Sequence, residues 1–165
     1  DHPDLHSFPT RRSSDLILRY IPGTDSGTFD FFVEVVFEKD ATAHLEATNT
    51  QLSEDDNVLV QGVEGSPYAV GYFGYAYYAE NQNKLNILTL DGIEATKENV
   101  DAFTYPLARP LFMYSDAAIM QAKPQVAAFL NFVLTYVNEE IETVGYFAAN
   151  DTDLNAARQA WLDAQ

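Results

Sequence analysis

Residues 22–32, with the sequence PGTDSGTFDFF, join a hydroxyl-rich turn to the start of an apolar helical segment. Gly23 and Gly27 favour backbone conformations that other residues avoid, and Ser26 and Thr28 place hydroxyl groups beside the first unpaired N–H groups of a helix. Such a turn suits an oxyanion such as phosphate, because backbone N–H groups and the helix dipole can hold it without a cation. Short turns of Ser, Gly and Thr are also common helix N-caps. The residues alone leave both interpretations open.

The elements that would position this turn alternate between strands and helices. The residue pattern predicts strands over residues 17–21, 69–73, 85–90 and 109–114. It predicts a loop over residues 40–51, a further short helix within 138–147, and helices over residues 29–39, 58–63, 74–81, 96–103, 124–137 and 151–164. This alternation is typical of α/β folds, in which ligands gather where strands end and helices begin.

The chain is acidic and contains no cysteine. Nine Lys and Arg residues face 25 Asp and Glu residues in 165, giving a net charge of −16, which argues against a nucleic-acid or anionic-membrane surface. The absence of cysteine excludes disulfides, thiolate catalysis and cysteine metal sites. No apolar run approaches the roughly 18 residues that span a bilayer. His44 lies in a predicted polar loop, where it is a poor metal ligand or catalytic base. We expect no cofactor, no bound metal and a monomer.

The first residues differ from the rest of the chain. Residues 7–16 (SFPTRRSSDL) match the translation of a common sequencing adapter, so we interpret residues 1–16, including His2 and His6, as a non-native leader. The alternative is a native polar leader. These residues contain two Arg and three Asp, so removing them changes the net charge only from −16 to −15. The acidity therefore belongs to the remaining chain.

Four segments, in order, resemble the phosphate-binding proteins of bacterial high-affinity phosphate ABC transporters. They are residues 22–30 (PGTDSGTFD), 53–63 (SEDDNVLVQGV), 70–78 (VGYFGYAYY) and 105–112 (YPLARPLF). The resemblance implies a type II periplasmic-binding-protein-like α/β fold, whose two lobes close about a hinge on phosphate. It also implies that this chain is a C-terminal fragment. Residues 17–90 would then belong to the second lobe, and residues 91–165 would return into the first.

The resemblance also identifies candidate ligand-binding residues. It implies that Ser26, Gly27 and Thr28 contact phosphate oxygens through hydroxyl and N–H groups. Asp25 either accepts a hydrogen bond from a protonated phosphate oxygen or only forms the turn. The first role would discriminate against fully ionised sulfate, which has no proton to donate. Many members of the family carry an arginine where this chain has Pro22.

Four further residues are weaker candidates for the site. Arg19 and Arg109 are substitutes for the missing arginine, and a surface or lobe-packing role is the alternative for each. Asp56 and Asn57 either direct a helix N-terminus at the ligand or only cap that helix. We expect the aromatic residues of the segment 72–78 to pack the strand–helix junction between the lobes.

The resemblance predicts an extracytoplasmic solute-binding protein. It would capture inorganic phosphate and deliver it to the membrane permease subunits of an ABC transporter, without catalysis. The location would be the periplasm or the outer face of the cytoplasmic membrane, with the signal segment missing from this fragment. A phosphate-processing enzyme that uses the same turn, and a sensor or adhesion protein that retains the fold, are the alternatives. No Gly-Lys-Ser/Thr follows the turn, as a P-loop enzyme would require.

Overall fold

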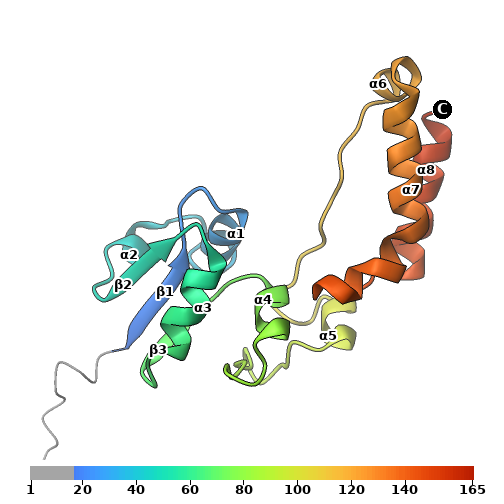
Figure 1. The fold of residues 1–165 in the computed structure, drawn as a ribbon. Helices are drawn as coiled ribbons and strands as arrows, with labels where there is room; N and C mark the ends of the chain where they lie inside the picture. Colours follow the sequence, from blue (N-terminus) through green and yellow to red (C-terminus); the bar gives the residue numbers. More distant parts are fainter. Residues whose placement is uncertain (1–16) are drawn as a thin grey trace, which may run out of the picture. The chain divides into compact units, whose positions relative to one another are not determined.

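The computed structural model describes residues 17–165 (Figure 1). The chain forms two compact units, one ending at Asn86 and the other beginning at Ile87. The expected leader, with His2 and His6, lies outside the described residues. The first unit contains the hydroxyl-rich turn.

A three-stranded parallel sheet forms the centre of the first unit. Its strands are β1 (Leu18–Pro22), β2 (Thr50–Ser53) and β3 (Ala69–Gly71). Their order is β2-β1-β3, with Pro22 of β1 paired with Ser53 and Tyr20 paired with Gly71. Because all three strands are parallel, their carboxyl ends lie at the same edge of the sheet.

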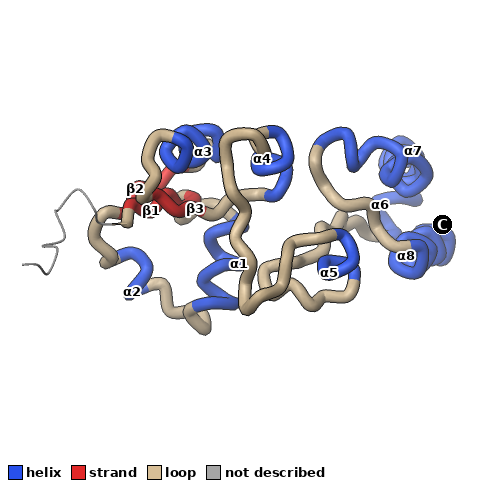
Figure 2. Tube along the Cα trace, turned by 90° about the horizontal axis from the view of Figure 1, so that it is seen from below, coloured by secondary structure: helices blue, strands red, loops and turns tan. Residues whose placement is uncertain are grey.

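Helices cover both faces of this sheet. They are α1 (Gly27–Val36), α2 (Thr42–Leu45), α3 (Asp56–Glu64) and α4 (Tyr75–Glu80). Figure 2 shows α3 on one side of the sheet and α1 and α2 on the other. Successive residues of β1 serve the two faces. Ile21 packs with Phe29 and Val33 of α1, whereas a Cβ atom on Gly62 of α3 would collide with the ring of Tyr20.

The second unit is mainly helical. It contains α5 (Lys97–Asp101), α6 (Ala117–Ala122), α7 (Pro124–Glu140), the 3₁₀ helix η2 (Ile141–Val144) and α8 (Asp151–Asp163). Helices α7 and α8 lie side by side (Figure 1). The indole N–H of Trp161 donates to the carbonyl of Ala127 at 3.0 Å, and Nε of Arg158 donates to the carbonyl of Leu134 at 3.0 Å.

Most of the predicted elements are present. The strands over 17–21 and 69–73 are confirmed, as are the helices over 29–39, 58–63, 74–81, 96–103, 124–137 and 151–164, with shifted ends. The segment 138–147 holds the end of α7 and the short η2. The pattern identified these elements because caps and apolar spacing are local signals.

Three predictions about the remaining segments are wrong. The expected loop over 40–51 contains α2 and the beginning of β2. Neither 85–90 nor 109–114 forms a strand, and Leu90 makes only an isolated antiparallel bridge with Ile93. Helix α6 was not predicted. A strand needs a neighbouring strand for its hydrogen bonds, and within residues 17–165 none pairs with either apolar segment.

Candidate functional site

Three helix N-termini lie at the carboxyl edge of the sheet in the first unit. Helix α1 follows β1, α3 follows β2 and α4 follows β3, each after a short loop. The neighbouring strands β1 and β2 are followed by helices on opposite faces of the sheet, since α1 and α3 lie on different sides (Figure 2). This reversal is a topological switch point, and open α/β sheets bind ligands outside the carboxyl ends of their strands at such points.

The turn between β1 and α1 lies at this edge of the sheet. Ser26 is the N-cap of α1, and its Oγ accepts a hydrogen bond from the N–H of Thr28 at 3.2 Å. The Ser26 N–H donates to the carbonyl of Gly23 at 3.0 Å, which tightens the turn. The N-cap interpretation is therefore confirmed. It does not exclude anion binding, because a hydroxyl that accepts one hydrogen bond still has an O–H to donate.

The two glycines of the turn have an ordinary backbone. Among the glycines of residues 17–165, only Gly92 and Gly145 have positive φ angles, so the expected conformational role of Gly23 and Gly27 is wrong. Gly23 is constrained in a different way, because a Cβ atom there would collide with the carboxylate of Glu54. The lack of a side chain, rather than conformational freedom, is what this position requires.

The loop between β2 and α3 lies at the same edge of the sheet. Asp55 is the N-cap of α3, and its Oδ1 accepts from the backbone N–H of Asn57 at 2.9 Å and from Asn57 Nδ2 at 3.1 Å. The cap is thus Asp55, and the predicted residues Asp56 and Asn57 lie in the first turn. Burial raises the pKa of the half-buried Asp56 carboxyl, and the nearby charges of Asp55 and Glu54 raise it further.

Two hydrogen bonds join the two loops directly. The N–H of Gly23 donates to the carbonyl of Ser53 at 2.9 Å, and the N–H of Asp25 donates to Oε1 of Glu54 at 3.3 Å. The structure therefore brings the predicted segment 25–28 to the same edge of the sheet as Asp56 and Asn57. Glu54, which the sequence analysis did not select, lies between them.

Of the two candidate arginines, Arg19 lies away from this edge. Arg19 Nη1 donates to the carbonyl of Thr48 at 2.7 Å, and Arg19 pairs with Thr50 at the start of β2. Three residues of strand, roughly 10 Å, separate it from Pro22 at the carboxyl edge. Arg109 belongs to the second unit.

The histidine that the sequence predicted in a polar loop, His44, is buried against the aromatic side chains of α1. His44 of α2 is only 6% exposed, and its Nε2 is hydrogen-bonded to the hydroxyl of Tyr72 at 3.0 Å. Its ring lies 5.4 Å from that of Phe32, which stacks on Tyr72 with ring centroids 3.8 Å apart. Burial and the charge of Arg19 lower the pKa of His44, and burial raises the pKa of Tyr72. The aromatic residues of α1 were the only sequence signal for this cluster.

The structure also bears on metals and membranes. Within residues 17–165, no group of three or more His, Cys, Asp or Glu side chains is arranged to hold a metal ion. The same residues include no helix that is both long and apolar enough to cross a membrane.

Comparisons with known proteins agree on one family. A family model described as a PBP superfamily domain matches residues 13–136. The protein SphX of Synechocystis sp. is 36% identical over 144 residues, which make up 84% of this chain and 42% of SphX. The phosphate-binding protein PstS of Staphylococcus haemolyticus is 32% identical over 148 residues, 87% of this chain and 44% of PstS. The chain thus spans less than half the length of these curated relatives.

A solved structure gives the same result. The crystal structure of a possible phosphate binding protein from Planctomyces limnophilus superposes with a TM-score of 0.68 at 35% identity. The match covers 90% of this chain and 54% of that chain.

Proposed function

The chain belongs to the PBP superfamily and is homologous to the SphX and PstS proteins, and from this we propose that it is part of a solute-binding protein for inorganic phosphate. In this proposal the full-length protein captures phosphate outside the cytoplasmic membrane and delivers it to the permease subunits of an ABC transporter. It binds as a monomer and performs no catalysis. The relatives with descriptive names, PstS and the Planctomyces limnophilus protein, are named as binding proteins.

The observation that carries the proposal is the position of the Ser26 turn. It lies at the N-terminus of α1, a position that favours anions, and at the topological switch point of the sheet, a position that favours ligands in general, and both support the proposal. The phosphate would accept hydrogen bonds from the N–H groups of Gly27 and Thr28 and from the hydroxyls of Ser26 and Thr28. Asp25, exposed one position before the cap, would accept a hydrogen bond from a protonated phosphate oxygen.

The remaining candidates have different roles in this proposal. Asp56 and Asn57 lie in the first turn of α3, so we assign them to the orientation of that helix N-terminus rather than to direct contact. Arg109 stays a candidate ligand from the second unit. We leave Arg19 out of the site because its guanidinium is bonded to the carbonyl of Thr48.

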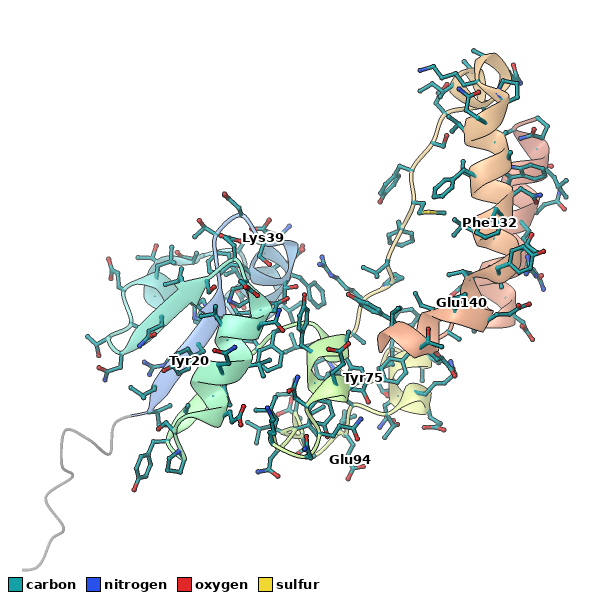
Figure 3. All side chains as sticks on the ribbon, in the orientation of Figure 1. Tyr20, Lys39, Tyr75, Glu94, Phe132 and Glu140 are labelled. Carbon is teal, nitrogen blue, oxygen red and sulfur yellow. The ribbon has the colours of Figure 1, made fainter. Side chains whose placement is uncertain are left out.

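We also propose that the complete site lies between two lobes. The division of this chain into a second lobe over 17–90 and a return into the first lobe over 91–165 stays a prediction. Several apolar side chains of the second unit are exposed, among them Phe129 at 61% and Phe132, labelled in Figure 3, at 59%. The part of the relatives that this chain does not match would cover such a surface. The complete site would then need ligand groups from that part.

Isothermal titration of the full-length parent protein with phosphate and with sulfate tests the proposal. We expect tight binding of phosphate, much weaker binding of sulfate and no turnover of phosphate esters. The 165-residue chain alone should bind phosphate weakly, because it supplies only part of the site. No heat with phosphate, or equal affinity for the two anions, would contradict the proposal.

A further inference from the structure

Among the described contacts, Glu54 is the side chain that connects the two loops. It follows β2 directly, and its Oε1 accepts the N–H of Asp25 in the opposite loop at 3.3 Å. The same carboxylate fills the space beside Gly23 that a Cβ atom would otherwise occupy. Its contacts therefore fall on the residues that lead from β1 into the cap of α1.

The position of Gly23 gives Glu54 a specific structural consequence. Gly23 is buried and has no positive φ angle, so its backbone would accept an alanine. The three atoms nearest to the methyl group of that alanine would all belong to the Glu54 carboxylate. A methyl group at this position would therefore act mainly by displacing the Glu54 carboxylate from its place beside Gly23.

Resting on the phosphate-binding function proposed above, we propose that Glu54 is a positioning residue of the anion site. Its carboxylate holds the Asp25 N–H and thereby fixes the loop that presents the Ser26 hydroxyl and the first N–H groups of α1. A charged acceptor makes a stronger hydrogen bond than a neutral one, although exposure to water weakens it here.

The charge of Glu54 and its hydrogen bond have opposite effects on the phosphate affinity. A carboxylate beside a bound anion repels it, whereas the hydrogen bond to Asp25 preorganises the loop that binds it. The two effects are separable, because glutamine keeps an oxygen acceptor in the same place and removes the charge. Alanine removes both.

The test compares the phosphate affinity of Glu54→Gln, Glu54→Ala and Gly23→Ala in the full-length parent by titration calorimetry. We expect Glu54→Ala and Gly23→Ala each to bind phosphate on the order of tenfold more weakly, since each frees the Asp25 N–H. Glu54→Gln should bind as tightly as the original protein, or up to about threefold more tightly at low salt. Glu46→Ala, an exposed glutamate of the same unit, controls for the change in net charge.

A double variant makes the test specific. Gly23→Ala added to Glu54→Ala should cost no further affinity, because the side chain that the methyl group displaces is already gone. Additive losses, an unchanged affinity in Glu54→Ala, or a loss in Glu54→Gln as large as in Glu54→Ala would each overturn the positioning role.

Amide hydrogen exchange without phosphate separates this inference from the proposed function. The Asp25 amide should exchange faster in Glu54→Ala and Gly23→Ala than in the original protein, and unchanged exchange would overturn the inference. If the parent protein fails to bind phosphate while these exchange rates change as expected, the proposed function fails and the contact between the loops stands.

Discussion

Substituting Ser26 with alanine separates the two roles that the turn combines. Ser26 Oγ accepts the Thr28 N–H at 3.2 Å, so alanine leaves that N–H without its capping partner and should lower the free energy of unfolding by about 1 kcal/mol. If a phosphate oxygen also accepts a hydrogen bond from the Ser26 hydroxyl, the variant loses one hydrogen bond to a charged ligand. Such a bond contributes roughly 1.5–3 kcal/mol, which corresponds to a loss in affinity of roughly tenfold to a hundredfold.

Thr96 provides a matched control for this substitution. It caps α5 in the second unit, where its side chain accepts the N–H of Asn99 at 3.3 Å. Thr96→Ala should therefore lower stability by about the same amount, measured by chemical denaturation, but leave the phosphate affinity unchanged in titration calorimetry. Equal losses of stability with no loss of phosphate affinity in Ser26→Ala would refute the reasoning, because Ser26 would then be only a helix cap.

Three further predictions concern stability in the first unit. His44 has a lowered pKa, so the unfolded chain binds a proton more readily; the denaturation midpoint should fall as the pH drops below 6.5, and His44→Gln should flatten this dependence. Asp56 has a raised pKa, so the free energy of unfolding should decline as the pH rises above 3.8. Asp56→Asn should therefore be more stable than the original protein at pH 7 but not under strongly acidic conditions, as measured by denaturation between those two conditions. Leu59 is 0% exposed, and Leu59→Ala should cost about 2–5 kcal/mol in urea denaturation, whereas a small loss would contradict tight packing of α3.

Local signals explain why much of the fold, and the helix cap in the candidate site, could be predicted. The cap at Ser26 and the proline that begins α7 depend on neighbouring residues, so the sequence shows them directly. The parallel sheet then follows from strands alternating with helices. The placement of the turn at the carboxyl edge follows from that topology, without knowledge of any side-chain contact.

The missed features depend on contacts between distant segments. Strand β2 has the polar sequence TQLS with Gln51 and Leu52 exposed, so it carries no apolar alternation and is defined by backbone pairing with β1. The buried His44 is in contact with aromatic rings from α1, from Phe37 and from Tyr72. The contact of Glu54 with Asp25 joins residues 29 positions apart. None of these relations has a local pattern.

The segment 109–114 shows the opposite relation between pattern and structure. It is apolar enough to predict a strand, yet Leu111, Phe112 and Tyr114 are 69%, 68% and 89% exposed. A strand forms only when its backbone groups pair with a second segment, and the residue pattern of 109–114 describes only one member of such a pair. Exposed apolar residues of this kind commonly mark a surface that another segment covers. In the two-lobed protein proposed above, we propose that this segment packs against the part of the fold that the curated relatives have and this chain does not match. The full-length parent should then protect the backbone amides of 111–114 from hydrogen exchange, and equal exchange in the parent and the 165-residue chain would contradict this inference.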